Sequence, residues 1–382
     1  MEALHEVSEI LQRNIYRIKE LTSNSWQSRT LYALAACRTA KLGGHIDKCN
    51  NTECNHIHIS YNSCGNRHCP KCQGGKQHQW IKAREKELFN TPYYHVVFTI
   101  PSELNKLALY EPKKLYGLLF KTSWSVIKGF AANAKFLGAK TGMIAILHTW
   151  GQTLSLHPHI HCIVPSGGIT ENKKWKNAKG KGKFLFPVKA MSKVFRARFV
   201  EQLRKEFVLK DELYGKLFSH NWTVYCKRPF FGPHQVVEYI GRYTHKVAIS
   251  NHRIQSIEND KVVFIAKDYR HGAKKYPVSL TQEEFIRRFS MHILPKGFPK
   301  IRYYGIMSHS LKNKIIPLLQ QQLGKVNLPE SPQTIKSRPC PVCNKGELVT
   351  LIFFKGGRDP PSHSRLKSLA EKLLMAEKNN VI

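Results

Sequence analysis

The sequence predicts an α+β fold, with a central antiparallel sheet flanked by helices and a small metal-binding module near the N-terminus. Two observations lead to this prediction. Strand-like apolar segments at 96–100, 143–150 and 157–164 alternate with segments of helical periodicity. Residues 37–80 instead hold six cysteines among Gly, Asn and His, so this segment has no core unless it binds an ion.

Charge and composition narrow the class of partner. The chain has 382 residues, enough for two or three domains, and its formal net charge is +35. Such an excess of Lys and Arg favours a polyanion, and we expect nucleic acid and not a membrane, because no apolar run reaches the ~18 residues of a spanning helix. The N-terminus does not resemble a signal peptide. We therefore expect a cytoplasmic protein whose cysteines are thiols or metal ligands.

The elements are expected in the following order. An amphipathic helix begins the chain, because Leu4, Val7, Leu11 and Ile18 recur at helical intervals. Later helices are expected at 104–136 and 189–209, strands at 222–226, 247–250 and 261–266, and helical structure after Thr281. The domains are then an N-terminal helical segment at 1–36, a zinc-binding module at 37–92, a catalytic domain at 93–280, a helical extension at 281–336, a cysteine knuckle like half a zinc ribbon at 337–357, and a charged tail at 358–382.

A Lys- and Gly-rich stretch at 171–184 interrupts the catalytic domain. This composition cannot pack into a core, so we expect an exposed loop that lies on phosphates. The lysines expected to contact DNA there are Lys173, Lys174, Lys179 and Lys181.

The cysteine spacing predicts structural zinc. Pairs such as Cys69-x2-Cys72 bring two thiolates to one tetrahedral ion, and two pairs close a site. The first grouping, which spacing favours, joins Cys49, Cys54, Cys69 and Cys72, and leaves Cys64 and Cys37 to a second site with His45 or His68. A second grouping adds Cys340 and Cys343, so that eight cysteines form two four-thiolate sites and the C-terminal knuckle completes one. Cys162 and Cys226 are expected in the core.

The run LSLHPHIHCIVP predicts a second, catalytic metal site. Alternate residues of a strand share a face, so His159 and His161 point the same way. Two imidazoles leave positions open on a divalent ion for water or a phosphate oxygen. Three residues are candidates for the third ligand: His148, which a hairpin would bring to the site, His157 and Gln235. Exposed histidines also form satisfied hydrogen-bond networks, but several on one face of so basic a protein favour a metal.

A helix expected at 233–247 carries two candidate nucleophiles. Tyr239 and Tyr243 lie one turn apart, with Arg242 and Lys246 on the same face as candidate DNA contacts. Forming a phenolate at pH 7 costs about 4 kcal/mol from a pKa near 10, which a metal and cations can offset. Taken alone, tyrosines at this spacing are more often packing residues. Together with the histidines they favour phosphodiester chemistry.

The chain resembles the insertion sequence ninety-one family of transposases, of the HUH superfamily of single-strand nucleases. The resemblance rests on the segments YNSCGNRHCPKCQ, HTWGQTLSLHPHIHCIVPSGG, YIGRYTHKVAISN and FIRRFSMHILPKGFPKIRYYG. It implies an HUH-type sheet, with His159 and His161 as the paired histidines and Tyr239 and Tyr243 as the first and second tyrosines. It also implies cleavage of one DNA strand through a 5′-phosphotyrosine link. Cys49-x4-Cys54 departs from the tighter cysteine pair common in relatives.

We therefore expect a bacterial transposase that acts through single-stranded intermediates, with structural zinc and catalytic magnesium or manganese. Its partner would be the ends of its mobile element, as single-stranded DNA that includes hairpins, and an oligomer is compatible with the sequence. One alternative is a rolling-circle replication initiator with the same chemistry. Another is a zinc-dependent DNA-binding regulator without catalysis.

Overall fold

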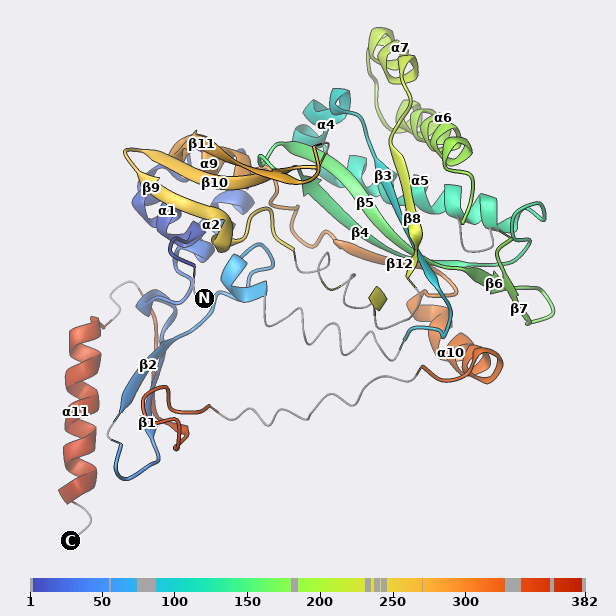
Figure 1. Ribbon diagram of the computed structural model, residues 1–382. Helices are drawn as coiled ribbons and strands as arrows, with labels where there is room; N and C mark the ends of the chain where they lie inside the picture. Colours follow the sequence, from blue (N-terminus) through green and yellow to red (C-terminus); the bar gives the residue numbers. More distant parts are fainter. Residues whose placement is uncertain are drawn as a thin grey trace.

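The computed structural model describes residues 3–54, 56–73, 87–179, 185–230, 235–236, 241, 246–269, 271–326, 338–357 and 361–379. A five-stranded antiparallel sheet in the order β12-β4-β5-β3-β8 dominates it (Figure 1). Its strands are β3 (Tyr93–Thr99), β4 (Gly142–Trp150), β5 (Leu156–Pro165), β8 (Val224–Phe230) and β12 (Ile301–Gly305). The strands expected at 96–100, 143–150 and 157–164 coincide with β3, β4 and β5 to within a few residues, and the α+β class is confirmed.

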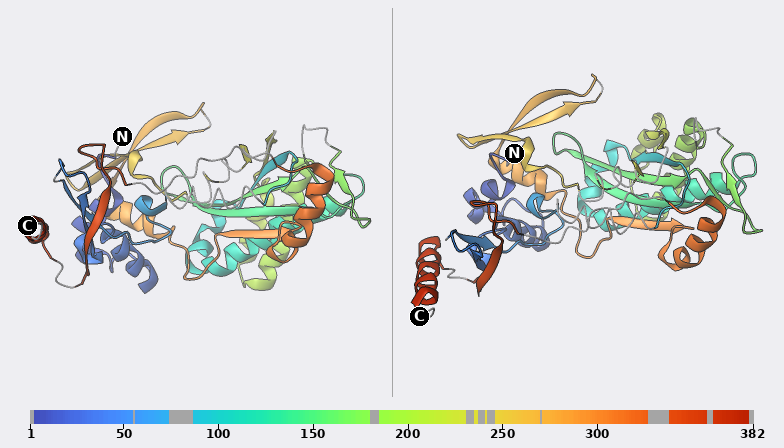
Figure 2. Two further views of the ribbon diagram at one scale, coloured as in Figure 1. Left: turned by 90° about the horizontal axis from the view of Figure 1, so that it is seen from below. Right: turned by 60° about the horizontal axis from the view of Figure 1, so that its bottom comes forward.

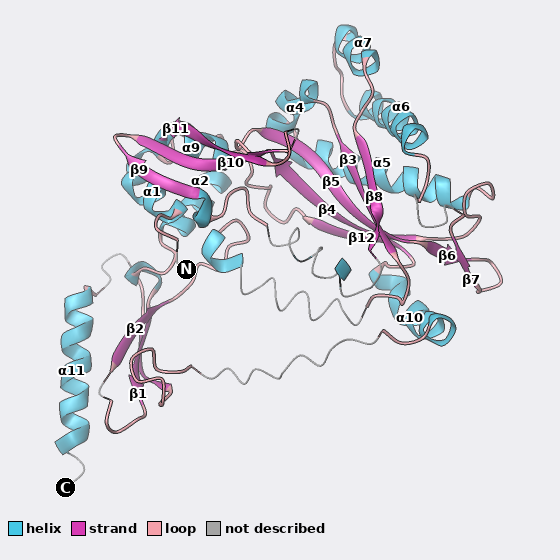
Figure 3. Cartoon of the chain, viewed as in Figure 1, coloured by secondary structure: helices cyan, strands magenta, loops and turns pink. Residues whose placement is uncertain are grey.

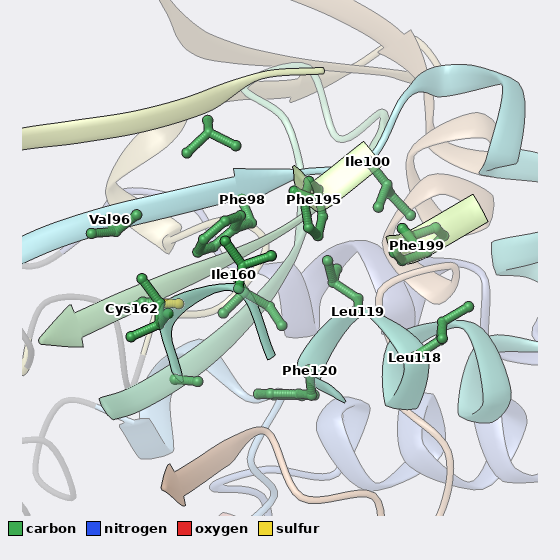
Figure 4. Close-up of a cluster of buried hydrophobic side chains, with 14 of the residues drawn as sticks. Val96, Phe98, Ile100, Leu118, Leu119, Phe120, Ile160, Cys162, Phe195 and Phe199 are labelled. Carbon is green, nitrogen blue, oxygen red and sulfur yellow. The ribbon is translucent and has the colours of Figure 1, made fainter. Parts of the chain in front are cut away.

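Helices cover one face of this sheet. They are α4 (Asn105–Tyr110), α5 (Pro112–Ala132), α6 (Val188–Glu206) and α7 (Asp211–Ser219), of which α7 was not expected. Figure 4 shows Phe98 and Ile160 of the sheet among Leu119 of α5 and Phe195 of α6, all of them buried. This apolar layer takes the alternate residues of β3 and β5, so the residues between them face the other way.

The opposite face of the sheet is partly covered. Ile144, Ile146 and Ile163 pack there against α10 (His309–Leu323) through Leu319. Val236 joins the same cluster, and it and Gln235 are helical, as is Gly241. The predicted tyrosine helix is therefore described only at these three positions and at 246–247. Tyr239, Arg242 and Tyr243 lie outside the described residues.

The helical extension expected at 281–336 is not purely helical. It holds α9 (Gln282–Ser290) and α10, but β12 lies between them and pairs with β4, with Tyr304 opposite Met143. The boundary at 280 therefore separates an edge strand from the sheet to which it belongs. Five residues between proline- and glycine-containing turns are too short to show a strand period.

A second sheet, in the order β11-β10-β9, lies beside the first (Figure 2). It consists of β9 (Ile254–Glu258), β10 (Lys261–Asp268) and β11 (Lys274–Thr281). Its apolar face shares one core with α9 and the N-terminal α1 (Val7–Arg13) and α2 (Ser25–Ala35), so residues 1–36 are not a separate unit. The strand expected at 247–250 is wrong: Ala248 and Ile249 bury their side chains in this core without a partner strand.

A third sheet joins the two ends of the chain. Its order is β13-β1-β2, from β1 (Gly44–Cys49), β2 (Ile57–Tyr61) and β13 (Leu348–Phe354). The helix α11 (His363–Asn379) packs on it through Leu366 and Ala370 (Figure 3). The expected loop at 171–184 is partly strand, because β7 (Trp175–Asn177) pairs with β6 (Gly167–Ile169) in a hairpin.

Candidate active site

Three histidines meet on the face of the central sheet that α5 and α6 leave free. His159 and His161 alternate along β5, and His148 of β4 stands directly opposite His159 in the antiparallel register. One ring nitrogen from each lies within 4.8 Å of the others. His148 and His161 are buried, with 2% and 8% of their surface exposed, so most of this group is enclosed by the protein.

Hydrogen bonds aim the two β5 histidines at each other. Nδ1 of His159 lies 2.6 Å from the carbonyl oxygen of His157, to which it must donate. Nδ1 of His161 lies 2.8 Å from Nε2 of His95 on the neighbouring strand β3. The two Nε2 atoms then face each other 3.1 Å apart. With Nδ1 held on each ring, Nε2 is the nitrogen left to bind an ion, as in metal-bound histidines whose other nitrogen is held by a partner.

The donor set fits a divalent cation. Two nitrogens that each bind one ion at about 2.1 Å are separated by about 3.0–3.4 Å for octahedral to tetrahedral angles. The 3.1 Å separation falls within this range. Burial lowers the pKa of His159 to about 4 and lowers the pKa of His161 as well, so both rings are neutral near pH 7. Neutral imidazole is the form that binds metals.

The candidate third ligands lie differently. The structure brings His148 into the group, whereas the His157 side chain is exposed, with its ring centre 5.1 Å from that of His159. Gln235 is also exposed. His148 stacks on Trp150 at 4.6 Å between ring centres, which fixes its plane. The residues that sequence reasoning missed are His95 and Trp150; a histidine amid the apolar run YYHVVFTI was the available signal.

Two lysines place positive charge beside the histidines. Lys300 donates to the carbonyl oxygen of Lys246 at 2.8 Å and lies 5.2 Å from the centre of the Trp150 ring. Burial, with Arg67 and Lys246 nearby, lowers the pKa of Lys300 to about 7. Burial also lowers the pKa of Lys246. A phosphate next to the three histidines would favour the protonated form of Lys300 and would be attracted by Lys246.

The cysteines form two separate groups of four. Cys37, Cys64, Cys69 and Cys72 make up one, with Cys37 Sγ 3.5 Å from Cys69 Sγ and 3.6 Å from Cys72 Sγ. Cys49, Cys54, Cys340 and Cys343 make up the other, with Cys49 and Cys343 sulfurs 3.6 Å apart and Cys54 and Cys340 sulfurs 3.9 Å apart. Sulfurs of a tetrahedral zinc site lie about 3.8 Å apart, so both groups fit a closed zinc site.

The first grouping of the cysteines is therefore wrong and the second agrees with the structure. Cys49 and Cys54 lie at the β1–β2 turn, which carries them away from Cys69 and Cys72. The pairing of Cys49 with Leu348 brings the C-terminal cysteines to that turn. Neither His45 nor His68 joins either group. His45 instead lies 3.3 Å from Asp47, a buried carboxylate that Arg338 also contacts.

In each group one thiol is easier to ionise than a free cysteine, whereas the pKa values of Cys64 and Cys69 in the first group and of Cys49 and Cys54 in the second are raised. Hydrogen bonds from Cys64 and Cys69 lower the pKa of Cys37 to about 2, and backbone N–H groups at Gly346 and Lys345 lower the pKa of Cys343 to about 6. The thiolate is the form that binds zinc.

The lysines expected on the loop at 171–184 are placed in part. Lys173 and Lys174 are exposed at the β6–β7 turn. Lys179 donates to the carbonyl oxygen of Ala134 at 3.0 Å, and Lys181 lies outside the described residues. Among the described helices, none has the length and apolar character that crossing a membrane requires.

Comparison with known proteins assigns the family. Residues 9–100 match a family described as "Transposase zinc-binding domain", and residues 142–314 match one described as "Putative transposase". A protein of Sinorhizobium fredii named "Putative transposase y4qJ" is 39% identical over 390 residues, which covers 93% of this chain and 97% of that relative. The "Transposase for insertion sequence element IS801" of Pseudomonas savastanoi pv. phaseolicola is 28% identical over 311 residues, 77% of this chain and 73% of the relative. No solved structure matches the chain. The zinc-binding family and the two cysteine groups together support structural zinc, and the chain belongs to the insertion sequence ninety-one family of transposases.

Proposed function

We propose that this transposase cuts and rejoins single-stranded DNA at the ends of its mobile element, with a tyrosine as nucleophile and a metal ion at the three histidines. The observation that carries the proposal is the convergence of His148, His159 and His161 on one face of an antiparallel sheet, with the Nε2 atoms of His159 and His161 3.1 Å apart. We infer that this sheet is of the HUH type. Magnesium or manganese would be the ion, and it would polarise the scissile phosphate.

The nucleophile would come from the helix that packs on the same face. Val236 anchors this helix to the sheet, and Lys246 follows it beside Lys300. The phenolate of Tyr239 would attack phosphorus, form a bond to the 5′-phosphate and release the 3′-oxygen, which takes up a proton as a hydroxyl. Lys246 and Lys300 would neutralise charge that develops on the phosphate oxygens. Tyr243, one turn later, would take the second strand.

The two zinc sites would support binding of the element's end. Cys340 and Cys343 would be the half zinc ribbon expected at 337–357, and its site would be completed by Cys49 and Cys54, which lie in the same group of four. A cytoplasmic location follows from a DNA substrate.

A covalent adduct tests the chemistry. The protein is incubated with labelled single-stranded DNA of the element's ends and Mn²⁺, and the products are separated in SDS. We expect a labelled protein band that Tyr239→Phe abolishes, and omission of Mn²⁺, with the zinc content unchanged, should stop its formation without releasing the DNA. Absence of the band on every end sequence would favour a DNA-binding regulator without catalysis.

The two tyrosines are distinguished by transposition in cells. If each tyrosine takes one strand, Tyr243→Phe should leave the first cleavage intact and block transposition. Unchanged transposition by Tyr243→Phe, with loss in Tyr239→Phe, would contradict the two-nucleophile scheme.

A further inference from the structure

The β10–β11 hairpin is an arm whose tip carries aromatic and basic side chains and little else. Near its base Val262 and Phe264 are buried in the core shared with α1 and α9. Toward the tip the same face continues as Tyr276 and then Lys274, which are exposed. Figure 2 shows the hairpin projecting from the body of the protein. Among the described residues of the tip, the exposed aromatic and basic side chains are Lys267, Tyr269, His271, Lys274, Lys275 and Tyr276.

Two tyrosines of the tip expose much of their ring surface to solvent. Tyr269 is 67% exposed and Tyr276 is 39% exposed, although buried tyrosine contributes far more to stability than exposed tyrosine. Asp268, the acidic residue of the described part of the tip, is paired with His271 at 2.7 Å. The three lysines therefore give the tip a net positive charge.

The arm is docked on the strands that carry the histidines. Arg253, the residue before β9, donates to the carbonyl oxygen of Gln152 in the β4–β5 turn at 2.5 Å and to that of Ile265 in β10 at 2.7 Å. The backbone N–H of Lys267 donates to Oε1 of Gln152 at 3.3 Å. The β4–β5 turn thus connects the arm to the histidine strands. His148 and His159 form the next pair of opposite residues after Trp150 and Leu156, which flank the turn.

Charged groups of the arm also influence the charged groups near the three histidines. The charges of Arg253 and Lys267 contribute to the lowered pKa of Lys246. The charge of Lys246 in turn contributes to the lowered pKa values of His159 and His161. Basic side chains therefore lie on the arm and also at Lys246, whose carbonyl oxygen accepts a hydrogen bond from Lys300.

We propose that the β10–β11 hairpin grips single-stranded DNA next to the scissile phosphate, with bases stacked on Tyr276 and Tyr269 and phosphates held by Lys267, Lys274 and Lys275. The proposal rests on the proposed function and deepens it by assigning the track of the strand. Single-stranded DNA fits better than a duplex, because a duplex hides the base faces that exposed aromatic rings can stack on. The lysines alone would suit either form.

Binding affinity is the first test. Fluorescence anisotropy with labelled oligothymidine and with a duplex of the same length is measured for the full zinc-loaded chain without added Mg²⁺ or Mn²⁺, so that no cleavage occurs. We expect Tyr276→Ala to weaken single-strand binding about 10-fold, within the range for one stacked base, and to leave duplex binding within about two-fold. The double variant Lys274→Glu/Lys275→Glu should weaken both and flatten the salt dependence.

Matched controls exclude general effects of charge and exposure. Tyr16→Ala removes a 93% exposed tyrosine from the N-terminal segment, and Lys367→Glu/Lys372→Glu makes the same charge change on α11. Both should leave single-strand affinity within about two-fold. Equal losses in the control and arm variants, or no loss in Tyr276→Ala at an unchanged melting temperature, would overturn the proposal.

Photo-crosslinking separates this proposal from the proposed function. An oligonucleotide with 5-iododeoxyuridine at one position near the cleavage site is irradiated with the protein, and the crosslinked peptide is identified by mass spectrometry. A crosslink at Tyr276 or Tyr269 supports the arm even if no covalent tyrosine adduct ever forms. A covalent adduct in wild-type protein, with crosslinks only outside 267–276, would leave the chemistry standing and remove the arm from it.

Discussion

Replacing His95 tests whether its hydrogen bond to His161 tunes metal binding at the site proposed for the three histidines. His95 is 3% exposed, and its Nε2 lies 2.8 Å from Nδ1 of His161. His161 must donate from Nδ1 if Nε2 is to hold the ion, so His95 accepts. His95→Phe fills a similar volume but cannot accept, which leaves a buried N–H without this partner at a cost of about 1–3 kcal/mol. Loss of a partner of this kind weakens metal binding about 10- to 100-fold.

His157 supplies an internal control. The Nδ1 of His159 is also held by one partner, but that partner is the carbonyl oxygen of His157 at 2.6 Å. His157→Ala keeps the carbonyl and should change metal affinity less than about three-fold. His95→Gln, whose amide oxygen can accept, should recover part of the loss in His95→Phe.

Manganese affinity is the direct measurement. Free Mn²⁺ is followed by its EPR signal as protein is added, and zinc content and melting temperature are recorded for every variant to show that the fold is intact. We expect the order wild type and His157→Ala, then His95→Gln, then His95→Phe. Equal affinity in His95→Phe and wild type, or an equal loss in His157→Ala, would refute the reasoning.

Three further predictions follow from the zinc sites and the buried charges. Cys340→Ser/Cys343→Ser should lower bound zinc from two ions per chain to one and reduce the melting temperature, as a colorimetric zinc assay and a thermal scan would show; two retained ions would contradict the grouping with Cys49 and Cys54. Asp47→Asn should lower the free energy of unfolding in urea by about 2 kcal/mol, because Arg338 and Thr350 donate hydrogen bonds to the fully buried carboxylate. The control Glu53→Gln, at an exposed site, should change this free energy by less than about 0.5 kcal/mol. For Lys300, the folded pKa of about 7 lies below the unfolded value of about 10.4, so the unfolded chain holds more protons between these values and stability should rise with pH there. Lys300→Met should show a smaller rise from pH 7 to 9 in urea unfolding, and an unchanged slope would argue against a buried, deprotonating lysine.

Short-range patterns were sufficient for the elements that carry the histidines. Strand geometry repeats every two residues, so the sequence around His159 and His161 already implied one shared face, and the neighbouring apolar residues implied the buried face behind it. A hairpin between 150 and 156 was enough to bring His148 opposite His159. The assignment of Tyr239 and Tyr243 as nucleophiles stays a prediction from the sequence, because both lie outside the described residues.

The sequence by itself determined the kinds of ligand and their local spacing, whereas only the tertiary structure decided which of them meet. Cys49 and Cys343 are neighbours because β1 pairs with β13 across most of the chain length, and no linear spacing encodes that pairing. His95 reaches His161 through the register of β3 on β5, and Lys300 reaches Trp150 through the return of β12 to β4. Contacts of this kind depend on the relative placement of distant strands, which is set by burial of the shared cores and not by any local sequence period.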